Sequence, residues 1–210
     1  MTSFFKKSSA YLISNILNGL SLLFLLPFLT RFLSTQEYSQ IVLFQTLIFG
    51  LLSFLHLNVF QASNIKFFDQ ETTHKDIQHY NSGCIIILIF SILFFTLILS
   101  NNLLFLSELL LLPELWIIYA MIIAISQIFI QFCLWQWQMR KQAYQYSLYN
   151  SCYIILSSLF TLMLLYILHD KIDARIYALM AISAVFFCIQ YLLSSKTNGL
   201  SSLVYQYQYQ

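Results

Sequence analysis

The chain has 210 residues, of which 60% are hydrophobic and 9% are charged, and its formal net charge is +2. A soluble domain carries roughly 25% charged residues, so this composition excludes an ordinary water-soluble fold. The basic residues fall at the ends of apolar segments instead of forming one basic patch. Their charge therefore reflects membrane topology, and it predicts no nucleic-acid partner.

Six apolar segments are long enough to cross a bilayer core about 30 Å thick, which takes about 20 helical residues. Runs such as IIILIFSILFF at 85–95 do not alternate apolar and polar positions, which favours helices over the strands of a barrel. The sequence therefore predicts an all-α integral membrane protein with about six transmembrane helices in one bundle. In chain order the expected spans are Tyr11–Phe32, Ile41–Phe60, Gly83–Leu99, Leu115–Trp135, Ser151–Leu168 and Ile176–Leu193.

Lysine and arginine in the connections predict the orientation of the bundle, because cytoplasmic loops are enriched in both residues. With the N-terminus in the cytoplasm, seven basic residues fall on the inner side and three on the outer side. We therefore expect both termini to be cytoplasmic, with the bundle at 1–195 and a polar, disordered tail or truncation scar at 196–210. The inner set is Lys6, Lys7, Lys66, Lys75, Arg140, Lys141 and Lys196, and the outer set is Arg31, Lys171 and Arg175.

The connection after the first span predicts a tight turn between two helices. Ser34 and Glu37 have the S-x-x-E spacing of a capping box, in which each side chain accepts a hydrogen bond from a free backbone N–H. Pro27 removes a backbone hydrogen bond and is expected to bend the first span near its outer end. Arg31 has two interpretations, an interfacial anchor whose charge reaches the headgroups or a cation that faces a central cavity.

The two longest connections differ in polarity. Residues 63–81 form the most polar internal segment, and we expect a helix extension followed by a solvated loop. Residues 100–114 are too apolar for a free loop, yet Asn101, Asn102 and Glu108 interrupt them, which indicates an interfacial segment.

The sequence contains no motif for covalent catalysis, so an enzyme is not expected. The pattern G-x-x-x-x-G-K-[ST] is absent, and the chain is therefore not an ATP-driven pump by itself. Acidic residues are absent from the spans, which argues against a proton relay or a sodium site built on a membrane carboxylate. No cofactor or metal is predicted, because Cys84, Cys133, Cys152 and Cys188 lack metal-binding spacing and are expected to be small buried residues.

Polar residues recur on one face of three predicted helices, at steps of three and four residues. In lipid such a face must contact protein or water, because an unpaired amide in hydrocarbon costs several kcal/mol. One interpretation is close packing between helices, and the other is a shared wet cavity open toward the cytoplasm. The faces are Ser8, Tyr11, Asn15 and Asn18; Ala120, Ala124, Gln127, Gln131, Trp135 and Gln138; and Tyr146, Asn150, Tyr153, Ser157 and Thr161.

Three segments match a known pattern. A basic pair precedes a span that ends in LPFLTRFLSTQEY, the second span ends in NVFQASNIKFF, and LWQWQMRKQAYQYSLYN precedes the fifth. They resemble bacterial polysaccharide flippases of the multidrug/oligosaccharidyl-lipid/polysaccharide exporter superfamily, whose hairpin reads P-x-x-T/S-R-x-L-x-x-x-x-Y-G. Pro27, Thr30, Arg31, Leu33 and Tyr38 match this hairpin, Ala62, Lys66 and Arg140 fill later positions, and Ser39 replaces the glycine.

The resemblance covers residues 1–195 and implies both a fold and a function. Family members have about 12 to 14 helices in two pseudo-symmetric bundles, so the chain is expected to be an N-terminal half. Whether this half is active without the second bundle stays open. The implied activity carries an undecaprenyl-pyrophosphate-linked oligosaccharide across the bacterial inner membrane for O-antigen or capsule biosynthesis. The implied partners are the lipid bilayer, this substrate, and polysaccharide polymerase and assembly proteins.

The resemblance and the polar faces together predict a substrate-binding set. Flipping requires cations for the pyrophosphate and a hydrated cavity for the glycan. Two other functions stay open, a multidrug or cation exporter of the same superfamily and a non-transporting accessory membrane subunit. The predicted set is Lys66, Arg140, Arg31, Asn15, Asn18, Gln127, Gln131 and Asn150.

Overall fold

The structure is a computed structural model that describes residues 2–57, 59, 74–139, 142–168 and 171–196. Within these ranges the regular secondary structure is entirely helical. Six helices are long and apolar enough to cross a membrane, which confirms the prediction of an all-α membrane protein. The helices are α1 (Thr2–Phe32), α2 (Thr35–His56), α4 (His74–Asn101), α5 (Leu103–Leu110), α6 (Glu114–Met139), α7 (Ala143–Ile167) and α8 (Lys171–Lys196).

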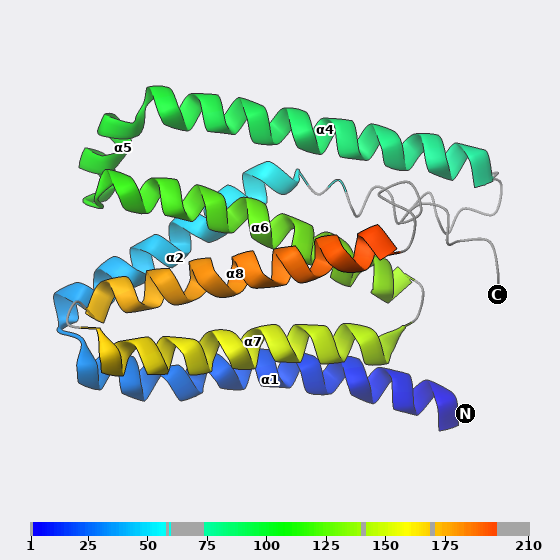
Figure 1. Ribbon diagram of the computed structural model, residues 1–210, viewed down its shortest axis with the longest axis horizontal. Coiled ribbons are helices and arrows are strands. Elements are labelled where there is room, and N and C mark those ends of the chain that lie inside the picture. The colour runs from blue at the N-terminus through cyan, green and yellow to red at the C-terminus, as the bar shows by residue number, and fades with distance from the viewer. Residues whose placement is uncertain (1, 58, 60–73, 140–141, 169–170, 197–210) are drawn as a thin grey trace.

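The long helices run side by side, and the short α5 joins α4 to α6 at one end of the bundle (Figure 1). α1 packs along α7, α7 along α8, α8 along α6 and α6 along α2, whereas α4 lies at the edge against α2. α1 begins and α8 ends at the same end of the bundle (Figure 1). Six consecutive long helices therefore return the chain to the end of the bundle from which it started.

The observed spans differ from the predicted ones mainly at their starts. The second helix begins at Thr35, where Ser34 caps it, and therefore earlier than the predicted Ile41. The sixth apolar span begins at Ile172, whereas the predicted span began at Ile176. This second difference matters for function, because it places Arg175 inside the membrane-spanning part of α8 and not in a loop.

The predicted capping box is confirmed at the turn between α1 and α2. The Glu37 N–H donates to Ser34 Oγ at 3.3 Å, and the Ser34 N–H donates to the Glu37 carboxylate at 2.6 Å. The turn does not create a packed helix pair, however. α1 and α2 diverge beyond it, and α1 lies along α7 (Figure 1).

We expect Ser34→Ala to lower the free energy of unfolding by about 1 kcal/mol, because a free N–H at the start of α2 loses its acceptor. Ser39→Ala is the matched control, since the Ser39 hydroxyl donates only to the Gln36 carbonyl within the same helix. Equilibrium unfolding in detergent measures both variants. Equal effects of the two substitutions would contradict a specific role of the cap.

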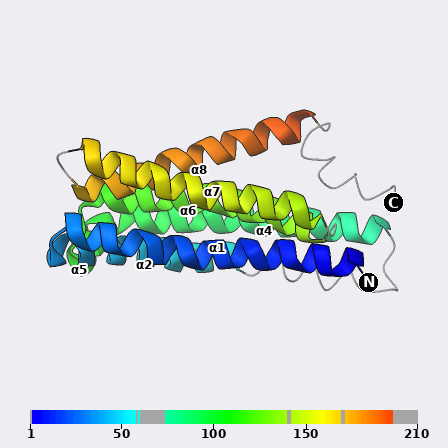
Figure 2. The ribbon, with the colours of Figure 1, turned by 90° about the horizontal axis from the view of Figure 1, so that it is seen from below.

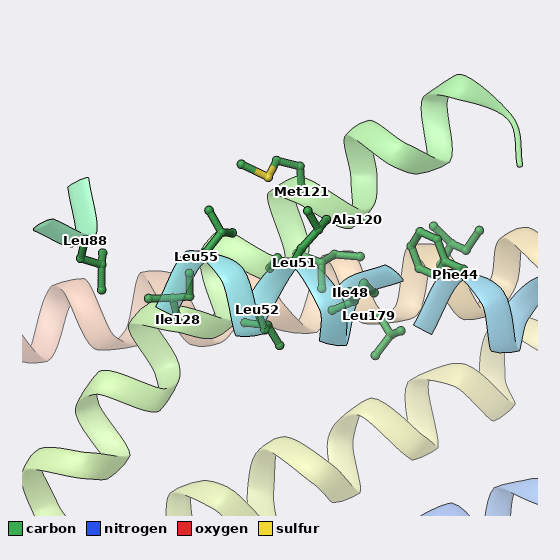
Figure 3. Packing of buried hydrophobic residues seen from close by; sticks show 13 residues of the cluster. Phe44, Ile48, Leu51, Leu52, Leu55, Leu88, Ala120, Met121, Ile128 and Leu179 are labelled. Carbon is green, nitrogen blue, oxygen red and sulfur yellow. The ribbon is translucent and has the colours of Figure 1, made fainter. Parts of the chain in front are cut away.

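The largest buried cluster joins α2, α4, α6 and α8. Phe44, Ile48 and Leu55 of α2 pack in one cluster with Ala120 of α6 and Leu179 of α8 (Figure 3). Ala120 and Ala124 of α6 are completely buried. These alanines allow α2 and α6 to approach closely. Because lipid tails are as apolar as this cluster, its stability comes from dense packing and dispersion rather than from removing apolar surface from water.

The rest of the bundle is less compact. A second cluster of buried residues, including Leu25, Leu29, Ile41, Leu165 and Ala174, joins α1, α2, α7 and α8 near the α1–α2 turn. α8 diverges from the other helices toward its C-terminal end (Figure 2). Large apolar side chains cover the outside, as the lipid-facing surface of a membrane bundle requires.

Three sequence-based expectations need correction or completion. The solvated loop expected before residue 81 is helical from His74, because α4 extends ahead of its apolar span Ser82–Asn101. Cys84 and Cys133 are buried as predicted, but Cys152 and Cys188 are exposed, because α7 and α8 turn them away from their neighbours. The segment 100–114 contains the helix α5, which has no buried residue.

Candidate functional site

α7 carries a polar face along its length. The half of α7 that is predicted to lie toward the cytoplasm contacts α1. Asn150 Nδ2 donates to Ser14 Oγ at 2.8 Å, and the rings of Tyr146 and Tyr11 meet edge to face with centroids 5.0 Å apart. Ser14 is completely buried. The small serine lets α1 come close to α7, and its hydroxyl oxygen accepts the hydrogen bond from the amide of Asn150.

The same face of α7 also connects α6 to α8. The Tyr153 hydroxyl accepts a hydrogen bond from Gln127 Nε2 of α6 at 3.3 Å and shares another with Ser183 Oγ of α8 at 3.3 Å. Gln190 of α8 donates to the Phe129 carbonyl of α6 at 2.6 Å. Polar side chains therefore join three helices in the middle of the bundle.

A buried cation lies further along α7, toward the end where α8 begins. Arg175 of α8 is 7% exposed, and its Nη1 donates to Thr161 Oγ1 at 2.7 Å. The Thr161 hydroxyl in turn donates to the Ser157 carbonyl at 2.7 Å. Arg175 Nε is fully buried and has no hydrogen-bond partner.

The structure separates the predicted substrate-binding residues into two groups. Gln127 and Asn150 are half-buried and form the interhelical hydrogen bonds described above. The other members that the structure describes are exposed: Asn15 and Asn18 on α1, Arg31 in the last turn of α1, and Gln131 on α6. The packing interpretation therefore describes Gln127 and Asn150, and the shared wet cavity stays a prediction.

Lys66 and Arg140 lie outside the described residues, so their predicted contact with the pyrophosphate stays a prediction. Within the described part of the chain, no group of three or more histidine, cysteine or acidic side chains is placed to hold a metal ion.

Sequence reasoning missed Arg175 as an interior residue, because the apolar run was counted only from Ile176. A signal was present in the two alanines around it. Ala174 and Ala178 have the four-residue spacing of one helix face, and both are completely buried. Small residues at this spacing indicate a helix contact that begins before the uninterrupted apolar run.

The fold and its polar interior define the class of the protein, a multi-pass α-helical membrane protein with a polar face at the centre of a six-span bundle. Comparisons with protein-family models, with characterised proteins and with solved structures give no match to this chain.

Proposed function

We propose that the chain is the N-terminal lobe of a bacterial flippase that moves a polyprenyl-pyrophosphate-linked oligosaccharide across the inner membrane, for O-antigen or capsule biosynthesis. The observation that carries this proposal is the exposed amide group on α1 and α6, in spans that are otherwise apolar. The hairpin pattern from Pro27 to Tyr38 supports it through resemblance, and the six spans fit one lobe of the family's fold.

Asn15, Asn18 and Gln131 are the residues that we assign to the glycan. All three are exposed within membrane spans, where an amide without a partner costs several kcal/mol. An amide both donates and accepts hydrogen bonds, as sugar hydroxyls do, so a hydrated glycan satisfies it. Asn150 and Gln127 instead hold the helices that carry these residues.

Lys66 and Arg140 are the cations that we assign to the pyrophosphate, and Arg31, in the last turn of α1, is a third. Arginine offers phosphate oxygens a planar, bidentate set of donors, and lysine offers a compact charge. The proposed partners are the bilayer, the lipid-linked oligosaccharide, and polysaccharide polymerase and assembly proteins.

The proposal places both termini in the cytoplasm, and cysteine labelling tests this orientation. α4 begins and α8 begins at opposite ends of the bundle (Figure 1). On a background without the four native cysteines, a cysteine at Lys171 is expected to react with an impermeant reagent added outside intact cells, and a cysteine at Lys75 is expected to be protected. The reverse pattern of labelling would overturn the orientation.

Transport itself is tested with purified protein from the full reading frame that contains this chain, reconstituted in liposomes. A fluorescent polyprenyl-pyrophosphate sugar in both leaflets is exposed to an impermeant quencher. In protein-free liposomes we expect the quencher to remove about half of the fluorescence, because it reaches only the lipid of the outer leaflet. In liposomes with the protein we expect more than half of the fluorescence to be quenched, because flipping brings lipid from the inner leaflet to the outer one. Equal quenching in the two preparations would contradict flipping.

The second candidate function is an accessory membrane subunit that does not transport. It is favoured by the hydrogen bonds of Asn150 and Gln127 to neighbouring helices, because residues satisfied in this way can serve packing alone. The substitutions Asn15→Leu and Asn18→Leu distinguish the two candidates. If the protein is a flippase, removing these exposed amides abolishes transport. If it is an accessory subunit, the variants still assemble with their partner and the host still makes normal amounts of surface polysaccharide.

A further inference from the structure

Arg175 is a buried cation that the proposed function does not use. It lies within the apolar span Ile172–Gln190 and is 7% exposed. One of its donors, Nη1, is fixed on Thr161, whose own hydroxyl proton is committed to the Ser157 carbonyl. Thr161 is completely buried, so this pair is a built feature of the α7–α8 contact and not a surface encounter.

The charge of Arg175 is not compensated by the part of the chain that the structure describes. Among these residues no carboxylate lies close enough to pair with the guanidinium, and Nε has no hydrogen-bond partner. The groups that the structure places around it are neutral, Ala174 and Ala178 on α8 and the hydroxyl groups of Thr161 and Tyr153 on α7. A cation in such surroundings is strongly destabilising unless an anion and further hydrogen-bond acceptors accompany it.

The geometry of the guanidinium indicates what completes the site. Nη1 occupies one edge of the planar group, and Nε–H lies on another edge, which it shares with Nη2. That second edge is the one that binds two oxygens of a carboxylate or phosphate side by side. A neutral ligand would satisfy the hydrogen bond of Nε but would leave the charge uncompensated.

We propose that Arg175, which Thr161 holds in place, forms a binding site for a phosphate-type oxyanion. The site lies near the end of the bundle where α8 begins, whereas Lys66 and Arg140 follow spans that end at the opposite end. The choice of phosphate over carboxylate rests on the proposed function. In that setting Arg175 receives the pyrophosphate at the outer end of its path, after the inner cations release it. Because Nε is buried, the anion reaches it when α7 and α8 separate locally.

The alternative is a purely structural role, in which Arg175 only ties α8 to α7 through Thr161. The two roles predict opposite effects of Arg175→Gln on stability without ligand. A structural tie is weakened by this substitution. An anion site that is empty carries an uncompensated buried charge, so the neutral glutamine, which can still bond to Thr161, makes the protein more stable.

The test is thermal unfolding of the purified full chain in neutral detergent and phosphate-free buffer. Inorganic pyrophosphate and geranylgeranyl pyrophosphate are titrated separately, and geranylgeraniol serves as the uncharged lipid control. Saturation at about 100 times Kd is expected to raise Tm by about 5 °C or more. Arg175→Gln is expected to have a higher Tm without ligand and no shift with either anion, and Arg175→Lys to keep a smaller shift.

Two matched variants separate this site from general effects. Lys171→Gln removes the same charge from the start of α8 and is expected to keep the full shift. Thr161→Val removes the neutral partner of Nη1 and is expected to lower Tm without ligand, yet to keep the response to the anion. A shift with both probes indicates a site that accepts free phosphate, and a shift with the prenyl compound alone indicates a lipid headgroup; both support the proposal.

Three results would overturn the proposal: no shift of the unmodified chain with either anion, an undiminished shift in Arg175→Gln, or a lower ligand-free Tm in Arg175→Gln. These binding measurements do not depend on transport. Failure of the liposome flipping assay together with an Arg175-dependent shift would leave an anion site in a protein of another function, so the two proposals fail separately.

Discussion

Arg140→Gln is expected to reduce surface polysaccharide at least tenfold when the variant replaces the native protein in its host. A hydrogen bond between charged groups contributes about 1.5–3 kcal/mol, which corresponds to about a tenfold to hundredfold change in an equilibrium. Arg140→Lys is expected to give an amount of surface polysaccharide between those of the native protein and Arg140→Gln, because lysine keeps the charge and loses the bidentate set of donors. Lys66→Gln is expected to resemble Arg140→Gln.

Lys141→Gln provides the matched control for this experiment. It removes one positive charge from the same predicted cytoplasmic connection, and it is not one of the residues assigned to the substrate. Membrane insertion is measured for every variant, since cytoplasmic cations also set topology. Normal polymer from both Lys66→Gln and Arg140→Gln would mean that these cations serve topology alone.

Phe44→Ala is expected to destabilise the bundle by about 2 kcal/mol. Phe44 is completely buried between α2 and α6, with its ring centroid 6.2 Å from that of Trp116. A large-to-small substitution in a core costs the transfer free energy of the removed atoms and the free energy of the cavity that they leave. In lipid the transfer free energy is small, because the surroundings are as apolar as the core. Most of the cost therefore comes from the cavity, at about 24 cal/mol for each Å³ of a cavity of roughly 100 Å³. Equilibrium unfolding in detergent measures the change.

Phe49→Ala on the same helix is the control for Phe44→Ala. Its side chain is 66% exposed, so lipid or detergent replaces the lost contacts and no cavity forms. We expect a change within about 0.5 kcal/mol, as for most exposed substitutions. A large effect at Phe49, or a small one at Phe44, would contradict the packing of α2 against α6.

The six spans could be predicted because hydrocarbon imposes a length and an apolar composition on every crossing segment. The start of α2 could be predicted as well, since the Ser34–Glu37 capping box is a local pattern. The partner of α1 could not. A short turn predicts that two helices are near each other at the turn, whereas the contact of α1 with α7 depends on side chains far apart in sequence, such as Ser14 and Asn150.

The polar faces of the helices were predicted from spacing, but their neighbours were not. Periodicity places Gln127 and Tyr153 on the interior faces of their own helices without saying that they meet. It also cannot tell a satisfied amide such as Asn150 from an exposed one such as Asn15. Arg175 was assigned to a loop because hydropathy treats a charge as the end of a span, although a buried guanidinium can lie inside one.

The most direct test of the proposed function is the leaflet in which lipid-linked oligosaccharide accumulates when the gene is deleted from its host. The measurement compares the oligosaccharide that an impermeant periplasmic reagent modifies with the total pool, in the parent, the deletion strain and the complemented strain. If the protein is a flippase, the deletion traps the oligosaccharide in the cytoplasmic leaflet and abolishes surface polymer, and complementation restores both. An unchanged leaflet distribution together with normal surface polymer would contradict the proposal.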